Sequence, residues 1–389
     1  GIKMAETQEA NKTVVIWETT VPVTVINVMA GQWAVESTYV ADVTDSLGSG
    51  EDNTAVYYHP AHDYNMEEIM DALVAARQQY SEWFYPYPWG DLRINEFPNL
   101  DQNATGFPIN ISFSEGVGFL TKPEPGAYLP FVVAAHEVAH QWWGHILSPA
   151  EGPGADFLIE GMANYSSLLL LESEKGDAAR RTFSRYMERQ YVRSRRIDSE
   201  IPLIMNNAEN SQGESVAYNK GAWVMWMLRS QLGEVQMMDG LKSFVGKNAL
   251  RDDALPDLKE LIHIFRSAAP DSSAFALFED QWFNHVVLPE FRLTHVEIKQ
   301  EDAGWKVQAT IENVGTGIVE VDVAAVEEMP DLERGEPDYS GQAVVKTLRL
   351  TPGQPVTFDI EAGFKPEGLV VDPHVMMLQV NREKAMFGF

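Results

Sequence analysis

Apolar and polar residues alternate in three different ways along this chain. In residues 13–45 the apolar side chains form short runs bounded by turn-forming residues, which predicts strands rather than helices. The expected strands are 13–17, 21–29 and 33–40, with a further strand at 55–59. The polar stretch 45–53 predicts a linker or a long turn before that last strand.

From about residue 60 to residue 290 the apolar positions recur at helical spacing. Asn65 followed by Glu68 indicates a capping-box-like start of the first helix. Strands are expected at 92–97 and 109–113, and further helices near 157–172, 178–195, 222–232, 235–245, 258–268 and 273–286. This middle region therefore predicts a mostly helical domain that contains a small mixed sheet.

From Phe291 onward the period changes to two, and Gly, Pro and Asp separate the segments. The expected strands are 291–298, 305–311, 318–323, 344–350, 356–360 and 375–380. This pattern is typical of a β-sandwich of immunoglobulin or fibronectin type. We therefore expect an α+β multidomain protein with boundaries at 1–54, 55–290 and 291–389.

The chemistry is concentrated in the segment FVVAAHEVAHQWWGH, which contains His136, Glu137 and His140. Because no Pro or Gly interrupts residues 131–143, the segment predicts one helix. Residues four apart lie on the same helical face, so both imidazoles can reach one Zn²⁺ ion, and Glu137 can reach a water bound to it. The alternative is a pair of ordinary surface histidines.

A catalytic zinc site needs a third protein ligand, and Glu160 in DFLIEGMANYSS is the candidate. Nineteen residues separate it from His140, and they include a loop rich in Gly and Pro that can turn the chain back. Apolar residues flank Glu160, which disfavours a solvated carboxylate. One turn later lies Asn164, for which ligand orientation and packing are equally reasonable roles.

Composition narrows the function further. The 389 residues include 29 basic and 57 acidic side chains, a net charge of −28, which disfavours nucleic-acid binding because phosphates would be repelled. The negative field would attract cations such as the ammonium ends of peptides, although solubility alone also explains the excess of acidic residues.

The absence of cysteine excludes disulfides, thiol nucleophiles and Cys-ligated zinc. No apolar run approaches the length of a membrane span, and no signal-like segment precedes the first strand.

Three separated motifs, HEVAHQWWG, LIEGMANY and YNKG, occur in the order that resembles the aminopeptidase N and leukotriene A4 hydrolase family of zinc metallopeptidases, within the gluzincins. The resemblance implies a thermolysin-like domain over 55–290, a truncated β region before it, and one Zn²⁺ per chain. By this resemblance His136, His140 and Glu160 bind the metal. Glu137 is the general base, and Tyr218 stabilises the tetrahedral intermediate.

The family also carries a glutamate that holds the free amine of the substrate, and Glu115 in the stretch SEGVGFL is the matching residue. Only Glu115 and Gly118 follow the family pattern there, so a rim carboxylate is the alternative. The spacing between His140 and Glu160 is one residue longer than usual for the family and equals that of thermolysin-like endopeptidases. The resemblance thus implies an aminopeptidase acting on peptides with a free N-terminus, with an open-cleft zinc endopeptidase or a non-catalytic peptide-binding module as alternatives.

The abbreviated arrangement resembles peptidase domains attached to bacterial membrane permeases. It implies an extracytoplasmic or periplasmic position, tethered through segments outside this chain, with a cytoplasmic position as the alternative. The oligomeric state is not predicted. Of the other histidines, His145 lies off the face of His140 and is expected to be a supporting or surface group, and His59 and His62 are expected to lie outside the site.

Overall fold

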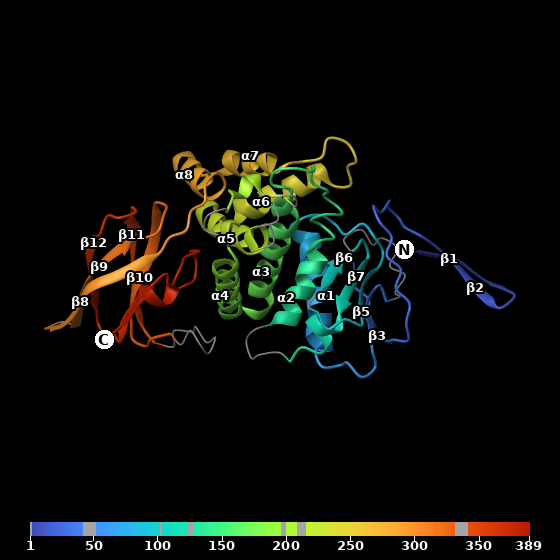
Figure 1. Ribbon diagram of the computed structural model, residues 1–389, viewed down its shortest axis with the longest axis horizontal. Coiled ribbons are helices and arrows are strands. Elements are labelled where there is room, and N and C mark those ends of the chain that lie inside the picture. The colour runs from blue at the N-terminus through green and yellow to red at the C-terminus, as the bar shows by residue number, and fades with distance from the viewer. Residues whose placement is uncertain are drawn as a thin grey trace.

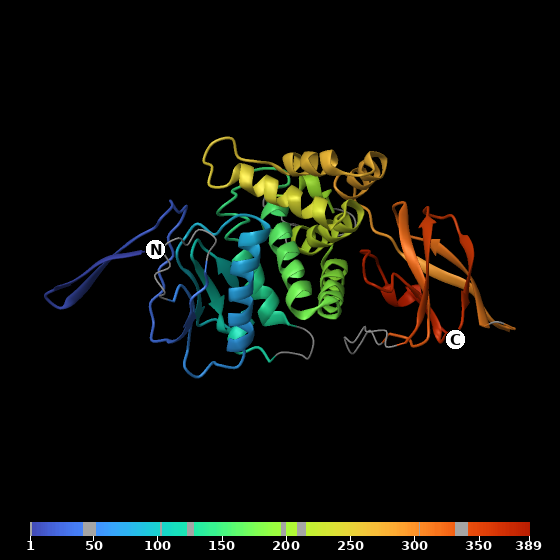
Figure 2. The same cartoon turned by 180° about the vertical axis from the view of Figure 1, so that it is seen from behind.

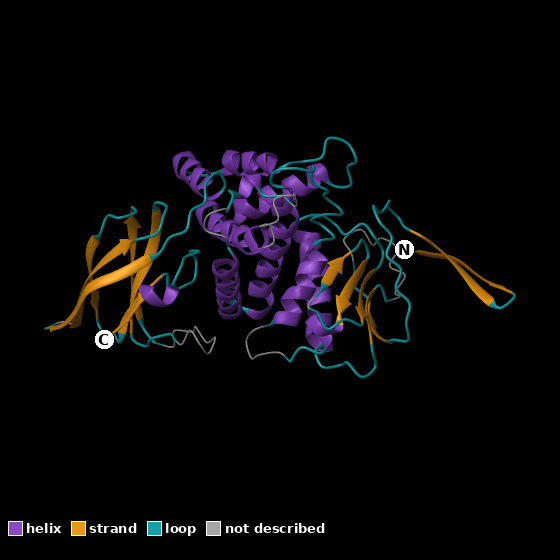
Figure 3. Ribbon diagram, viewed as in Figure 1, coloured by secondary structure: helices purple, strands orange, loops and turns teal. Residues whose placement is uncertain are grey.

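The computed structural model describes residues 2–41, 52–101, 103–122, 128–195, 200–207, 215–302, 304–330 and 341–389. Strands lie at both ends of the long axis, and the helices fill the middle (Figures 1 and 3). This order of β, helical and β regions confirms the mixed α/β character that the sequence predicts. Among the described residues, every helix is too short or too polar to cross a bilayer.

The N-terminal region contains a two-stranded hairpin and a five-stranded sheet. The hairpin strands β1 (Ile2–Glu9) and β2 (Lys12–Glu18) pair antiparallel and project from the body (Figure 1). The sheet has the order β3-β4-β5-β7-β6, with parallel central strands and antiparallel edges. Its strands are β3 (Ala34–Thr38), β4 (Thr54–Tyr58), β5 (Leu92–Phe97), β6 (Ala104–Gly106) and β7 (Asn110–Ser114).

The strand expected at 21–29 is wrong, because those residues form no strand. Pro22 lacks a backbone donor, and Ile26 and Val28 are 79% and 82% exposed. Asn27 instead uses its side chain to donate to the Ser112 hydroxyl on β7 at 2.7 Å. The expected turn at 45–53 lies largely outside the described residues.

The helical region begins with α1 (Met66–Trp83), which lies beside the sheet (Figure 2) and packs against α2 (Leu129–Ala139). The capping box expected at its start is wrong. Asn65 donates to the carbonyl of Thr121 at 2.7 Å and to that of Gly118, and Glu68 accepts the amide of Phe131 at 3.3 Å. Both side chains therefore connect α1 to neighbouring segments rather than capping it.

The remaining helices confirm the expected segments with small changes at their ends. They are α3 (Met162–Lys175), α4 (Asp177–Ser194), α5 (Gly221–Leu232), α6 (Glu234–Asn248), α7 (Leu258–Ala268) and α8 (Ser272–Trp282). The helix expected over 131–143 is shorter, because α2 ends at Ala139. Tight turns follow, in which Trp142 donates to the Ala139 carbonyl, and Gly144 adopts a φ of +129° that continues no helix.

The C-terminal region consists of two antiparallel sheets, ordered β11-β10-β13-β14 and β12-β9-β8. The strands are β8 (Phe291–Glu301), β9 (Gly304–Asn313), β10 (Val319–Val326), β11 (Ala343–Leu350), β12 (Val356–Ala362), β13 (Gly368–Val371) and β14 (Met386–Gly388). Alternate residues are buried along β9 and in the first half of β10, as expected of two sheets that share a core, and residues 323–326 of β10 are all buried. The immunoglobulin or fibronectin assignment and the three domain boundaries stay predictions.

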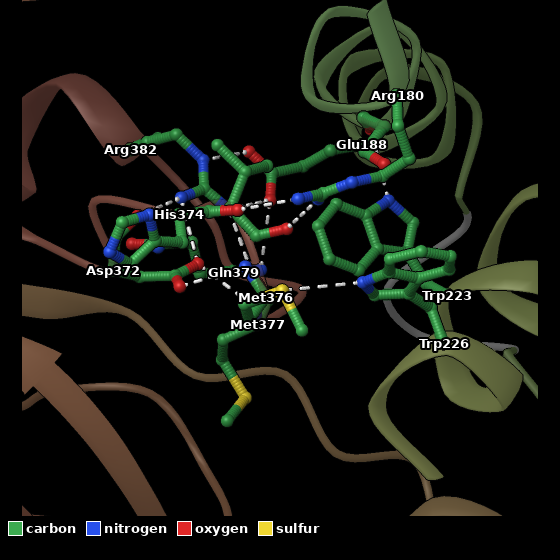
Figure 4. Close-up of polar contacts among 12 residues, drawn as sticks. Arg180, Glu188, Trp223, Trp226, Asp372, His374, Met376, Met377, Gln379 and Arg382 are labelled. Carbon is green, nitrogen blue, oxygen red and sulfur yellow. Dashed lines mark hydrogen bonds and ion pairs between the residues drawn. The ribbon is translucent and has the colours of Figure 1, made fainter. Parts of the chain in front are cut away.

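The strand expected at 375–380 is wrong, and the segment serves a different purpose. Asp372 and Val375 both have a φ of +52°, which turns the chain out of the sheet after β13. The Asp372 carboxylate then accepts the amides of Met376 and Met377 at 2.8 and 2.9 Å. The loop formed in this way lies against α4 and α5 (Figure 4).

A buried ionic network joins this loop to α4 (Figure 4). Arg382 contacts Glu188 at 2.8 Å and Asp372 at 2.9 Å, and all three side chains are at most 7% exposed. Burial tends to lower the pKa of Arg382, but the two carboxylates outweigh burial and raise it. Arg180 of α4 adds a bond to the carbonyl of Val375 at 2.7 Å. The helices and the C-terminal sheets are thus connected through charge as well as apolar packing.

We expect Arg382→Met to lower the free energy of unfolding by about 3–5 kcal/mol, because Glu188 and Asp372 would remain buried without their cation. Urea denaturation followed by circular dichroism measures this loss. The control is Arg349→Met, whose exposed ion pair with Glu320 should contribute less than about 1 kcal/mol. Equal losses in both variants would contradict the role of the buried network.

His145 connects the loop after α2 to edge strand β6. Its Nε2 donates to the carbonyl of Gly106 at 2.6 Å, which makes it a supporting group for the edge strand. Gly106 is required there for space, since a Cβ would lie 2.6 Å from the Glu137 carbonyl oxygen. Burial lowers the pKa of His145 from 6.5 to about 4, although the bond to Gly106 opposes this.

Because the folded pKa of His145 lies below the unfolded value, the unfolded chain binds more protons as the pH falls from 6.5 to 4. The stability that neutral His145 contributes is therefore present above pH 6.5 and is lost as the pH falls from 6.5 to 4. The free energy of unfolding should be lower by about 2–3 kcal/mol at pH 4.5 for this reason. His145→Gln keeps a donor but cannot titrate, so its free energy of unfolding should fall less between pH 7.5 and 4.5. The control is His263→Gln at an exposed position, whose free energy of unfolding should fall as much as that of the wild type between pH 7.5 and 4.5. An equal fall in all three proteins would reject this explanation.

Candidate metal centre and active site

His136 and His140 point one nitrogen each toward a common position. Their Nε2 atoms lie 3.0 Å apart. The Nδ1 of His136 lies 2.8 Å from Asn164 Oδ1, and that of His140 lies 3.1 Å from the carbonyl oxygen of Trp143. Because both partners are acceptors, each Nδ1 donates its hydrogen, and each Nε2 is left as the ring atom that can bind a metal ion. This is the tautomer that a metal ion requires.

Glu160 completes the group from η2 (Phe157–Gly161), a single π-helical turn before α3. Its Oε2 lies 3.3 Å from the Nε2 of His136 and 3.4 Å from that of His140. This oxygen is buried, yet it accepts no well-formed hydrogen bond from the described residues. A tetrahedral Zn²⁺ with bonds of about 2.0–2.1 Å places its ligand atoms about 3.3 Å apart. The three side chains therefore fit zinc in spacing and in donor chemistry.

The charges of His136, His140 and Glu160 also favour a bound cation. Burial acts to raise the pKa of Glu160, but the two imidazoles outweigh it and hold the pKa below its usual range. Burial acts to lower the pKa of His140, yet Glu160 outweighs it and raises the pKa to about 9. An ionised carboxylate thus faces two ring nitrogens in a largely buried position, where positive charge is strongly favoured.

Glu137 lies next to this group and is 7% exposed. Burial raises the pKa of its carboxyl, and the neighbouring His136 and His140 oppose the rise. A carboxylate whose pKa is raised toward neutrality is better able to accept and return a proton. Glu137 is therefore a candidate proton acceptor beside the three residues.

Tyr218 lies on η5 (Ser215–Lys220), the turn that precedes α5. Its ring stacks on the imidazole of His136, with centroids 5.5 Å apart and planes 14° from parallel. The turn is anchored by Lys220, whose Nζ donates to Glu200 at 2.7 Å with both side chains at most 1% exposed. The structure thus brings Tyr218 to the predicted metal ligands, more than 50 residues after Glu160 in the sequence.

Glu115 is placed in a second group, with His62 and Glu96. It begins η1 (Glu115–Phe119), the turn after β7. His62 Nδ1 is hydrogen-bonded to Glu96 Oε1 and lies 4.0 Å from Glu115 Oε2. Because that nitrogen is already engaged, this group fits a zinc ion less well than the first. It is a pair of carboxylates with one imidazole between them, and its contact with His62 was not expected from the sequence.

Glu115, Glu160 and Tyr218 share a local structure that sequence reasoning missed. Each lies on a π-helical turn, and such turns are rare and frequently occur at functional sites. A glycine follows each residue closely, at Gly116, Gly161 and Gly221. That repeated glycine was the available signal. The contact of His140 with the Trp143 carbonyl gave no such signal in the sequence, because a residue of any type can offer a backbone acceptor.

Comparison with known proteins finds relatives of this part of the chain. Residues 122–279 match the sequence model described as the Peptidase family M1 domain. The chain is 29% identical to the endoplasmic reticulum aminopeptidase 2 of Bos taurus over 70% of its own length and 29% of that protein. It is 22% identical to aminopeptidase N of Streptomyces lividans over 48% of its length and 23% of that protein. The chain thus spans less than a third of these curated relatives.

Solved structures show a similar fold. Legionella pneumophila aminopeptidase A, in complex with aspartic acid, superposes with a TM-score of 0.58 at 16% identity, over 88% of this chain and 37% of that one. The M1 zinc metallopeptidase of Deinococcus radiodurans gives a TM-score of 0.51 at 19% identity, over 72% and 60%. The matched region holds five of the six predicted site residues, namely His136, Glu137, His140, Glu160 and Tyr218. The chain thus carries a peptidase family M1 domain, the domain of the aminopeptidase N family, over residues 122–279.

Proposed function

We propose that this protein is a zinc-dependent aminopeptidase that removes N-terminal residues from peptides. The observation that carries the proposal is the convergence of His136, His140 and Glu160, with ligand atoms 3.0–3.4 Å apart and Glu137 beside them. A metal held only for structure would need neither a buried base nor a phenol at the same position. The relatives named aminopeptidases support the reaction class.

Zinc held by these three residues would supply a polarised water and a Lewis acid for the peptide carbonyl. Glu137 accepts a proton from the attacking water and then donates it to the leaving amine. The hydroxyl of Tyr218 donates to the oxygen that gains charge as the carbonyl is attacked. Asn164 and the Trp143 carbonyl hold the imidazoles in the required tautomer throughout.

Selection of a free N-terminus is assigned to Glu115. Its carboxylate is 19% exposed and lies beside Glu96, so this group offers negative charge to an α-ammonium. The net charge of −28 favours the approach of cationic peptide ends. The open-cleft endopeptidase remains the second candidate, because Glu115 contacts His62 and no contact joins it to the metal ligands within the described residues. Permease attachment and an extracytoplasmic position stay predictions.

Removal of the metal by a chelator should abolish hydrolysis, and added zinc should restore it.

Glu137→Gln should bind one zinc per chain, by metal analysis, and show no measurable turnover, because the amide cannot accept the proton. Tyr218→Phe should lower kcat by about 10²–10³ and leave the zinc content unchanged. Turnover near the wild-type level in either variant would contradict the assigned role.

A panel of aminoacyl chromogenic substrates, each with a free and an acetylated amine, tests the specificity. We expect hydrolysis of the free-amine series only. Glu115→Gln should raise KM for that series at least tenfold, because a charge-assisted bond to the ammonium is lost. Glu82→Gln, an exposed substitution on α1, is the control and should change neither KM nor kcat. Equal cleavage of both series would favour the endopeptidase.

A further inference from the structure

Two glycines bring the turn of Glu160 and the turn of Tyr218 into backbone contact. Gly161 ends η2, and Gly221 begins α5 directly after η5. A Cβ added to Gly221 would lie 3.2 Å from the Cα of Gly161, and one added to Gly161 would lie 3.0 Å from the carbonyl oxygen of Ala217. Both distances are shorter than ordinary van der Waals contact.

The need for glycine at these positions is one of space. Gly161 has helical dihedral angles, φ −62° and ψ −40°, and Gly221 has no left-handed φ. Any L-residue adopts such a backbone without strain. A side chain at either position would instead force the two turns apart, because the two main chains approach each other directly.

The surroundings leave little room to absorb a methyl group. The ring of Phe157 would lie 3.3 Å from a Cβ on Gly221, and that ring is fully buried against Phe283. At the end of η5, Lys220 is fixed by its buried ion pair with Glu200. The indole of Trp223 fixes α5 through a 3.0 Å bond to the Ser184 carbonyl on α4. The turn carrying Tyr218 is therefore held at its last residue and through the helix that follows it.

These contacts connect the turn of Glu160 and the turn of Tyr218 at two places, through His136 and through the two glycines. Glu160 precedes Gly161 directly and lies 3.3 Å from the Nε2 of His136. His136 stacks on Tyr218, and three residues later the chain reaches Gly221, which meets Gly161. The distance between the third metal ligand and the phenol is therefore set by the contact of the two glycines.

We propose that Gly161 and Gly221 are positioning residues whose contact fixes the Tyr218 hydroxyl relative to the metal ligands, a step that rests on the proposed aminopeptidase function. A methyl at either position moves the two turns apart by a few tenths of an ångström. Displacements of this order lower the rate of the chemical step more than they weaken substrate binding, because only the reacting geometry is affected.

The test compares Gly221→Ala with Gly246→Ala, a helical glycine of α6 that has open space around it. Gly221→Ala should lower kcat about tenfold and change KM less than threefold, whereas Gly246→Ala should change neither. In a Tyr218→Phe background, Gly221→Ala should lower kcat less than twofold, because the phenol through which it acts is absent. An undiminished loss in that background, or a wild-type kcat in Gly221→Ala, would overturn the proposal.

A second measurement needs no turnover. Competition with a chromogenic chelator gives the zinc dissociation constant, which should rise about tenfold in Gly161→Ala, because the added methyl displaces the turn of Glu160, and stay unchanged in Gly246→Ala. Unaltered zinc affinity in Gly161→Ala would overturn the proposal. If the wild type hydrolyses no peptide, the proposed function fails, and the chelator measurement still decides whether the two glycines position the ligand.

Discussion

The ionised carboxylate of Glu160, held against two imidazole nitrogens, is the constraint on which the site depends. A buried carboxylate is costly unless a cation compensates it, and here the compensating groups are rings whose lone pairs also need a cation. Asn164 and the Trp143 carbonyl prevent the rings from turning away to find other partners. A divalent ion held by the three side chains would satisfy both the carboxylate and the two ring nitrogens.

Holding that carboxylate in place requires backbone that is locally unfavourable. A π-helical turn inserts one extra residue into a helix and weakens its hydrogen bonding, so the surroundings must compensate. In this chain fully buried groups surround the turns of Glu160 and Tyr218, namely the ring of Phe157 in η2, the ion pair of Lys220 with Glu200 at the end of η5, and the indole of Trp223 on α5. Three of the predicted functional residues, Glu115, Glu160 and Tyr218, lie on such turns, and the turns of Glu160 and Tyr218 meet at Gly161 and Gly221.

Most of the helices and the two C-terminal sheets were predictable from periodicity, because their buried faces repeat at regular spacing. The metal ligands were predictable because a helix places His136 and His140 on one face. The failures have a different origin. The segments 21–29 and 375–380 are apolar enough for strands, but Pro22 and the left-handed Asp372 direct them elsewhere. Asn65 bonds distant carbonyls, and His62 meets Glu115 only through tertiary contacts that no local pattern encodes.

The ionic network under the C-terminal sheets gives those sheets a physical connection to the site. Arg382 holds Glu188 on α4 (Figure 4). One turn earlier on the same helix, the carbonyl of Ser184 accepts the indole hydrogen of Trp223 on α5. Residues 218–220 lie directly before that helix. Because each contact in this series is buried, a displacement of the sheets relative to α4 would be resisted by the groups that also fix the turn of Tyr218. The C-terminal region is therefore connected to the turn of Tyr218 through α4 and α5, in addition to extending the apolar core.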